Sequence, residues 1–261
     1  MKALKLWQYR GLLWAFVKRD VHERIAGSVF GPVLLILQPL SQILIYVFLF
    51  KYVFKVRIRL GNQGSEDFLR FFLVGFVPWS IHAEAILRAA NSLLAQGHLL
   101  KKVLFPPEIL PLSSVCGTYL LGIPALGCLA LILALAGGVS WEAAFSPLIY
   151  VLQFFFSLGI SLFFAAVLVY LRDLQLFLGI IMSVWFYASP ILYSVEMLPE
   201  KLRLLLWLNP YTYMVHLWQT AFLGHQLVWL NVVVSVAAAL FFFLGGWWFF
   251  NRCKEGFTDV L

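Results

Sequence analysis

The sequence predicts an all-α integral membrane protein with six transmembrane helices. Hydrophobic residues make up 62% of its 261 residues and charged residues only 12%, whereas soluble proteins are about 45–50% apolar and about 25% charged. The apolar residues gather in several long runs, and about 20 of them in a row can cross the hydrocarbon core of a bilayer as a helix. A transmembrane barrel would instead alternate over segments of about ten residues. A helical bundle in a membrane is therefore expected.

An amphipathic helix is predicted before the first span, in a cytoplasmic region that covers residues 1–30. Apolar residues recur there every three or four positions, at Trp7, Gly11, Trp14, Val17, Val21 and Ile25. A charged cluster accompanies them, at Lys18, Arg19, Glu23 and Arg24. We expect this helix to lie on the inner face of the membrane, with its rings in the acyl boundary and its basic residues toward anionic headgroups. A helix that simply packs on the bundle is the alternative.

The transmembrane domain is predicted over residues 31–250, and a cytoplasmic tail over residues 251–261. The six spans are Gly31–Phe50, a second that starts near Phe71, Ile109–Gly138, Ala143–Leu171, Leu174–Val195 and Gln226–Phe250. An even number of spans places both termini on one side. If that side is the cytoplasm, the inside segments hold twelve Lys and Arg residues and the outside seven, so the positive-inside rule favours cytoplasmic termini. Five basic residues in the first outer loop oppose this orientation.

The second span contains two charged residues, Glu84 and Arg88. Because residues four apart lie on the same face of a helix, we expect an ion pair near the inner membrane interface. Such a pair offsets part of the cost of about 2.5–3.5 kcal/mol that each charge pays at the centre of a membrane. A proton relay is the alternative.

Uncharged polar and aromatic residues follow helical faces of the first and fifth spans. Amides can exchange hydrogen bonds with a hydroxyl-rich solute and rings can stack on sugars, so these faces are predicted to line a substrate pathway. The alternative is contact between helices, because Ser and Gln commonly form hydrogen bonds across membrane interfaces. The predicted pathway residues are Gln38, Gln42, Tyr46, Ser183, Trp185, Tyr187 and Tyr193.

The sequence offers no candidate catalytic residue and no metal site. It lacks the glycine-rich phosphate loop that binds a nucleotide, the paired motifs that hold zinc and the nucleophile motif of hydrolases. Its five histidines are scattered along the chain. The basic residues lie in short loops between apolar runs, a distribution that reflects membrane topology rather than nucleic-acid binding.

The stretch Leu171–Gly224 contains an Arg-Asp pair, a Ser-Pro-Ile-x-Tyr motif, a Leu-Pro pair and an Asn-Pro pair in this order. In this respect it resembles the membrane subunits of ATP-driven polysaccharide and polyol-phosphate exporters, the O-antigen (Wzm-like) and teichoic-acid permeases. The similarity extends to the segments GSVFGPV at 27–33, VGFVPW at 74–79 and KKVLFPPEILPL at 101–112. It therefore covers most of the chain.

The resemblance implies a homodimer in the bacterial inner membrane, with two separate ATPase subunits that would bind ATP and magnesium, while this chain would hold no cofactor. It assigns the inner loop between the second and third spans to coupling with the ATPase. That loop can form a short helix, which Pro106 and Pro107 would end. The predicted coupling residues are His98, Leu99, Lys101, Lys102 and Phe105.

The resemblance also implies an outer gate at residues 196–224, a segment too charged to cross a bilayer and rich in Leu, Trp and Tyr. Two short helices, Leu198–Trp207 and Tyr211–Leu223, would form a re-entrant hairpin that is broken at Asn209-Pro210. Such a hairpin can place aromatic rings in the outer leaflet and keep charged groups in water. The predicted gate residues are Leu198, Trp207, Tyr211, Tyr213 and Trp218.

The resulting expectation is a transport subunit, not an enzyme, that exports a lipid-linked polysaccharide, first of all O-antigen for lipopolysaccharide biosynthesis. Export of teichoic acid, of a capsular polysaccharide, or of a drug or lipid by the same superfamily stays open. Outside this superfamily, a secondary transporter would need ionisable residues in the membrane, and a lipid-linked glycan transferase would need a reactive carboxylate or histidine cluster.

Overall fold

The computed structural model describes residues 8–25, 31–54, 57–59, 65–97, 105–135 and 139–260. Among these residues, four helices are long and apolar enough to cross a membrane: α4 (Phe68–Ala95), α6 (Ile109–Leu135), α7 (Ser146–Tyr170, continuous with a 3-10 turn at Trp141–Phe145) and α11 (Trp229–Cys253). Two shorter apolar helices are α3 (Gly31–Val47), which a π-helix continues over Phe48–Phe54, and α8 (Leu174–Tyr187). The prediction of a helical, multi-pass membrane protein is confirmed.

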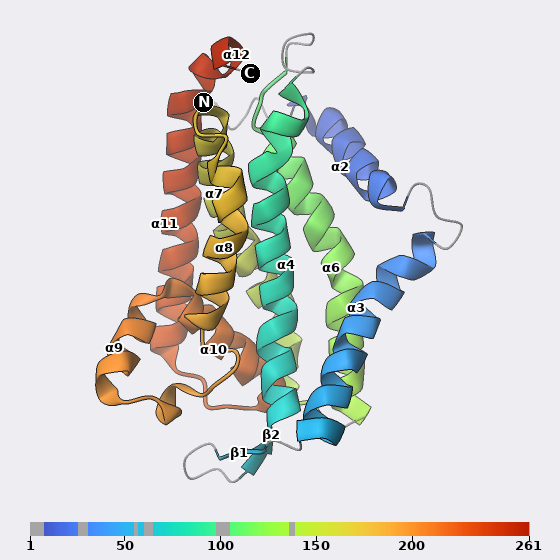
Figure 1. Cartoon of the computed structure of the whole chain (residues 1–261), viewed down its shortest axis with the longest axis vertical. Helices are drawn as coiled ribbons and strands as arrows, with labels where there is room; N and C mark the ends of the chain where they lie inside the picture. The colour runs from blue at the N-terminus through green and yellow to red at the C-terminus, as the bar shows by residue number, and fades with distance from the viewer. Residues whose placement is uncertain are drawn as a thin grey trace.

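The remaining elements lie at the two ends of the bundle (Figure 1). Helix α2 (Arg10–Ile25) and helix α12 (Phe257–Val260), which follows a 3-10 turn at Lys254–Gly256, are at one end. Strands β1 (Arg57–Arg59) and β2 (Ser65–Asp67) are at the other end, together with the 3-10 turn Val195–Met197 and helices α9 (Glu200–Leu208) and α10 (Pro210–Leu223). We call these the inner and the outer end, respectively.

The two strands depart from the predicted all-α fold. They pair antiparallel, with Arg57 opposite Asp67 and Arg59 opposite Ser65. An antiparallel pair needs only a short connection and a few residues. The pattern of hydrophobic residues along the chain could not reveal strands of this length.

Helix α8 is shorter than the predicted span Leu174–Val195. It has 14 residues and ends at Tyr187, so it is about 21 Å long. The chain turns immediately afterwards, through Ser189 and Pro190, because the residue before a proline is disfavoured in helical conformation. Part of the predicted fifth span is therefore a turn that leads to α9.

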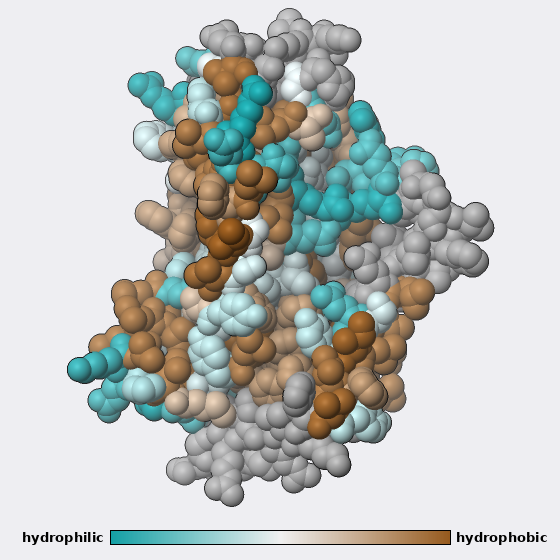
Figure 2. All heavy atoms as spheres, in the orientation of Figure 1, coloured by the Kyte–Doolittle hydropathy of each residue, from teal (hydrophilic) through white to brown (hydrophobic). Residues whose placement is uncertain are grey.

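Helix α4 is the centre of the bundle and α11 lies at its edge. The most apolar window of α4 is 72% buried within the chain, and that of α11 is only 17% buried. Figure 2 accordingly shows apolar side chains on the outer surface, over α8 and α3, with hydrophilic residues gathered around α2 and α9. An apolar surface of this extent fits a protein that is surrounded by lipid.

Helices α7 and α11 form the most extensive helix pair, and glycines allow their close approach. A Cβ atom on Gly246 of α11 would overlap the carbonyl oxygen of Gly159 on α7, and one on Gly159 would overlap the backbone of Phe242. Small residues at such crossings are typical of membrane helices, because dispersion contacts, rather than the hydrophobic effect, hold helices together in lipid.

Candidate functional site

A cluster of aromatic rings lies where α4, α7, α8 and α10 meet. Its centre is His82 of α4, which is fully buried. The ring centroid of His82 lies 4.7 Å from that of Tyr211 on α10, 5.4 Å from that of Phe156 on α7 and 5.4 Å from that of Trp185 on α8. We call Trp79, His82, Phe156, Trp185 and Tyr211 the central cluster. It brings side chains from four helices together, so it fixes α10 against the bundle.

A chain of hydrogen bonds extends from His82 into the bundle. Ser157 donates its hydroxyl hydrogen to the carbonyl oxygen of Gln153 at 2.8 Å. Its oxygen lies 2.6 Å from Nδ1 of His82 and 2.6 Å from the hydroxyl of Tyr119. Because Ser157 has only one hydrogen to donate, it accepts from both neighbours, which assigns the ring hydrogen of His82 to Nδ1. Nε2 of His82 is then an acceptor, and it has no partner among the described residues.

Gln153 of α7 connects α10 to α4. Its Nε2 donates to the carbonyl oxygen of Pro78 at 2.8 Å, and its Oε1 accepts from Nε1 of Trp218 at 2.7 Å. All three residues are buried. A buried amide that uses both of its ends holds the two helices in a defined register, since any shift would leave polar groups unpaired.

Asn209 joins the end of α8 to the start of α10. Its Oδ1 accepts from Nε1 of Trp185 at 2.8 Å and from the backbone nitrogen of Tyr211 at 3.0 Å. Its Nδ2 donates to the carbonyl oxygen of Ala188 at 2.9 Å and to Oγ of Ser189 at 3.0 Å. Asn209 is thus the N-cap of α10 and Pro210 its first residue, which is the usual order at a helix start.

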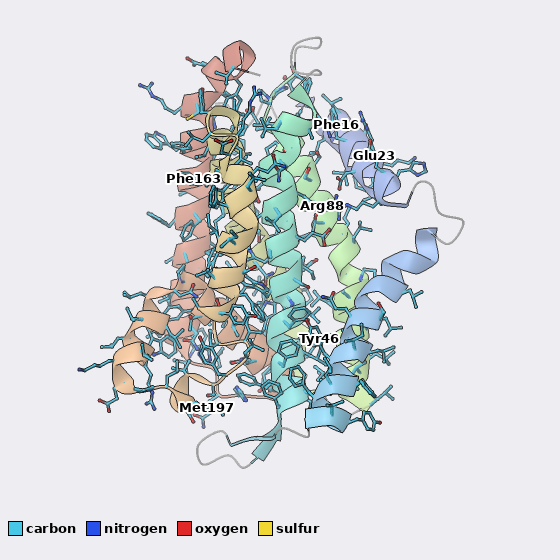
Figure 3. The ribbon with its side chains drawn as sticks, in the orientation of Figure 1. Phe16, Glu23, Tyr46, Arg88, Phe163 and Met197 are labelled. Atoms are coloured by element: carbon cyan, nitrogen blue, oxygen red, sulfur yellow. The ribbon has the colours of Figure 1, made fainter. Side chains whose placement is uncertain are left out.

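Two of the predicted pathway residues are half-buried and pack against the bundle core. The ring centroid of Tyr46 on α3 is 4.8 Å from those of Phe72 and Phe76 on α4, and Figure 3 shows Tyr46 between these helices. Trp185 belongs to the central cluster. The ring of Phe76 contacts that of Tyr46, and Phe186 follows Trp185 in α8. The ring centroids of Phe76 and Phe186 are 6.2 Å apart, so these two rings connect Tyr46 to Trp185.

The other predicted pathway residues face outward. Gln42 on α3 and Ser183 and Tyr187 on α8 are exposed, and the hydroxyl of Ser183 donates to the carbonyl oxygen of Gly179 in its own helix at 2.9 Å. Tyr193 is half-buried and donates to the carbonyl oxygen of Tyr187 at 2.7 Å. The side chain of Gln38 lies outside the described residues. A single chain therefore does not gather these residues into one enclosed site.

The predicted gate segment contains two helices, α9 and α10, which are separated at Asn209. Trp207 stacks on His216, with ring centroids 5.2 Å apart and an angle of 14° between the planes. Tyr213 donates to the carbonyl oxygen of Trp207 at 3.0 Å, and Leu198 is half-buried in the segment before α9. Tyr211 and Trp218, by contrast, are buried in the bundle. They anchor α10, and the more accessible gate residues are Leu198, Trp207 and Tyr213.

His216 lies in α10 outside the candidate spans. Burial, together with the nearby charge of His225, lowers the pKa of His216 from 6.5 to about 4. At neutral pH its ring is therefore uncharged, which suits its stacking on Trp207.

An ionic cluster joins α2 to α4 and α6 near the inner end. The predicted ion pair is confirmed: Nε of Arg88 lies 2.9 Å from Oε1 of Glu84. The same oxygen lies 3.2 Å from Nη1 of Arg24. Nη2 of Arg24 contacts Oδ2 of Asp20 and Oγ1 of Thr118, each at 2.7 Å. Figure 3 shows Arg88 on the side of α4 that faces α2.

The predicted orientation of Arg24 toward lipid headgroups is wrong. Its side chain is only 9% exposed, because Asp20 on the preceding turn and Glu84 on α4 pair with it inside the interface. Burial lowers the pKa of Arg24 from its ordinary value, and the Asp20 carboxylate opposes this shift. Glu23 and Arg19 do face outward, where they form an exposed pair at 2.6 Å.

The end of the predicted coupling loop contacts both ends of the chain. His98, Leu99, Lys101 and Lys102 lie outside the described residues. The ring centroid of Phe105 is 5.6 Å from that of Phe16 on α2. Glu108 is buried, and its Oε1 accepts from Nζ of Lys254 at 2.8 Å. The point where the inner loop enters α6 is thus attached to α2 and to the segment that follows α11.

Sequence reasoning missed several of these contacts. His82 carried a usable signal, since a histidine within an apolar span is rare. Glu108 and Lys254 did not, because they are 146 residues apart and no local spacing connects them. Among the described residues, no three His, Cys, Asp or Glu side chains are placed to hold a metal ion.

The chain is similar in sequence to known membrane transport proteins. The ABC-2 type transporter family matches the chain over residues 11–223. The O-antigen export system permease protein RfbA of Klebsiella pneumoniae is 29% identical over 253 residues, which is 96% of this chain and 95% of the relative. The protein of the same name from Myxococcus xanthus is 32% identical over 230 residues, 85% and 84% of the two chains.

Proposed function

Because the chain belongs to the ABC-2 type transporter family, we propose that it is the transmembrane subunit of an exporter that moves lipid-linked O-antigen across the bacterial inner membrane. The observation that carries this proposal is the extent of the similarity to O-antigen export permeases, which covers 96% of this chain and 95% of one relative. The family match spans residues 11–223, which include the central cluster and the α9–α10 unit. ATP hydrolysis would take place in a separate subunit that binds ATP and magnesium.

The proposed topology has six spans, in which α3 and α8 complete the four long helices. The inner end, with α2 and α12, lies in the cytoplasm, and the outer end, with β1, β2, α9 and α10, faces the periplasm. Helix α8 covers about 21 Å, less than the roughly 30 Å of a bilayer core. The turn after it would thus lie within the outer leaflet, and α9 and α10 would form a re-entrant hairpin there. Backbone that is not helical is tolerated at such depth when the protein satisfies its polar groups. Asn209 does this at the turn, through its hydrogen bonds to Ala188 and Tyr211.

The proposed transport passage forms between two copies of the chain. Gln42, Ser183 and Tyr187 are exposed on α3 and α8 in the single chain, and a second copy would enclose them. Uncharged amides, hydroxyls and rings can bind sugars weakly enough to release them, which a processive carrier requires. Trp207 and Tyr213 would close the passage at its outer end.

Coupling to the ATPase would use the inner loop that contains Lys101 and Lys102. Force applied to this loop would reach α2 through Phe105 and Phe16, whose rings are in contact. It would reach the C-terminal segment through the ion pair of Glu108 and Lys254. Two contacts of one loop with separate elements allow a local push to move the inner end as a unit.

Reconstitution tests the proposal. Proteoliposomes that contain the chain and its ATPase are expected to export lipid-linked O-antigen, whereas liposomes with the chain alone are not. The variant Lys101→Glu/Lys102→Glu is expected to lose at least about tenfold in substrate-dependent ATP turnover, a loss of about 1.4 kcal/mol in coupling. Arg57→Glu/Arg59→Glu on the outer strand β1, outside the gate segment, is the matched double control and should keep wild-type turnover. Export by the isolated chain would refute the proposal, and unchanged turnover of the inner-loop variant would refute the coupling assignment.

A further inference from the structure

The C-terminal segment, residues 254–260, packs against the inner end of the bundle. It comprises the 3-10 turn after α11 and helix α12 (Figure 1). The side chain of Phe257 in this segment is only 1% exposed. Its ring centroid lies 5.3 Å from that of Phe250 on α11 and 6.1 Å from that of Tyr170, the last residue of α7. A buried ring between two helix ends gives the segment a defined position.

Two hydrogen bonds attach the C-terminal segment and the end of α11 to the connection between α7 and α8. The hydroxyl of Tyr170 donates to the carbonyl oxygen of Cys253 at 2.8 Å. Gly256 permits this close approach, because a Cβ atom at its position would lie 2.6 Å from the Tyr170 hydroxyl. Nη2 of Arg172 donates to the carbonyl oxygen of Val260 at 2.9 Å. Helix α8 begins two residues after Arg172, so the segment is attached at the start of α8.

An ion pair attaches the same segment to the end of the inner loop. Nζ of Lys254 lies 2.8 Å from Oε1 of Glu108, and their side chains are only 20% and 7% exposed. Glu108 directly follows Pro107 and precedes α6. Replacing a buried ion pair by apolar residues of similar volume often costs no stability, so stability alone does not account for these two charges. Their geometry instead fixes where the end of the inner loop meets the C-terminal segment.

We infer that the C-terminal segment is a strut that transmits movement of the inner loop to α8, with Glu108 and Lys254 as its positioning residues. The ion pair passes the movement into the segment, and Arg172 passes it to the turn before α8. Helix α8 carries Ser183 and Tyr187, two exposed residues of the proposed passage. The inference rests on the proposed function, because it takes the inner loop as the place where the ATPase acts, but it does not depend on the identity of the cargo.

Hydrogen–deuterium exchange of the full-length chain in complex with its ATPase tests this inference without any cargo. The probe is a non-hydrolysable ATP analogue, and amide exchange is followed in the inner loop and in the turn between α7 and α8. In wild type the analogue is expected to change exchange at both places. Glu108→Gln/Lys254→Met removes both charges together, so it leaves no buried charge unpaired. In this variant the inner loop should still respond, whereas the response of the turn should fall at least about fivefold.

A second variant breaks the strut at its other attachment. Arg172→Gln removes the hydrogen bond to Val260 at an exposed position, where a substitution seldom disturbs folding. The turn should again lose its response while the inner loop keeps it. Lys254→Arg preserves the ion pair and is expected to respond like wild type. Arg252→Met, which removes an exposed cation from the same end of α11, is the matched control and should also respond like wild type.

The outcomes separate this inference from the proposed function. A full response of the turn in Glu108→Gln/Lys254→Met or in Arg172→Gln would overturn the strut and leave the coupling assignment intact, as would a wild type that responds only in the inner loop. A lost response in Arg252→Met would also overturn it, because the effect would then come from charge in general. A wild type that does not respond in the inner loop would refute the coupling assignment, and the strut with it.

Discussion

The two joints that hold peripheral helices on this bundle are built from different chemistry. At the outer joint, α10 is attached to α4, α7 and α8 by Gln153, Trp218, Asn209 and the central cluster, all of them uncharged groups. At the inner joint, α2 is attached to α4 and α6 by a charged cluster that Arg24 and Glu84 share with their neighbours.

The two joints also differ in how far their side chains are exposed. In the inner joint Glu84 is 50% exposed and Arg88 is 45% exposed, while Arg24 is only 9% exposed. Gln153 and His82 of the outer joint are fully buried. An unpaired charge at a buried position is destabilising, whereas hydrogen bonds between neutral groups satisfy the polar atoms at a smaller cost in free energy. Ionic attraction varies slowly with distance, whereas a hydrogen bond depends sharply on geometry. The inner joint is thus suited to transmit small movements, and the outer joint to hold α10 in one position.

The largest effect is expected at the outer joint, from Gln153→Leu. This change leaves the indole nitrogen of Trp218 buried without its partner and removes the side-chain donor to the carbonyl of Pro78, so we expect the free energy of unfolding to fall by about 1–3 kcal/mol. The midpoint of unfolding of the purified chain, followed by tryptophan fluorescence, measures this loss. Gln42→Leu, which changes an exposed amide, is the matched control. If both variants lose the same stability, the buried amide does not hold the joint.

A smaller and salt-dependent effect is expected at the inner joint, from Glu84→Gln. This change removes the carboxylate that Arg24 and Arg88 share, and because Glu84 is half exposed the loss should be about 1 kcal/mol. Raising the ionic strength should shrink the difference from wild type, since salt screens exposed charges. Unfolding midpoints at low and high salt check this expectation, with Glu23→Gln in the exposed pair as the control. If the stability loss of Gln153→Leu depended on ionic strength as strongly as that of Glu84→Gln, the two joints would not differ in their chemistry.

An effect that appears only at acidic pH is expected for the α9–α10 unit. The pKa of His216 is about 4 in the folded chain, below its ordinary value of 6.5, so the unfolded chain takes up a proton first as the pH falls. The contribution of this residue to stability is complete above about pH 6.5 and is lost progressively toward pH 4. We expect His216→Phe, which keeps a ring against Trp207, to show a weaker loss of stability over this range than wild type. Identical pH profiles of unfolding for wild type and His216→Phe would contradict the lowered pKa of His216.

Local pattern determined much of the architecture. The long apolar runs predicted α4, α6, α7 and α11, and the spacing of Glu84 and Arg88 predicted their ion pair. The break at Asn209-Pro210 separated two short helices, as expected from the preference of Asn for the N-cap and of Pro for the first helical position. These features depend on neighbours within one or two helical turns, which is the range over which sequence periodicity carries information.

The sequence by itself determined that this chain is a helical membrane protein with two short helices, separated at Asn209-Pro210, after its fifth apolar run. Only the tertiary structure decided that Arg24 turns inward, that Tyr211 and Trp218 anchor α10, and that Glu108 meets Lys254. The physical reason is that apolar burial in a membrane selects residue types along a helix, whereas the direction in which each polar side chain turns depends on a partner from a distant part of the chain. Such partners become known only once the helices are packed.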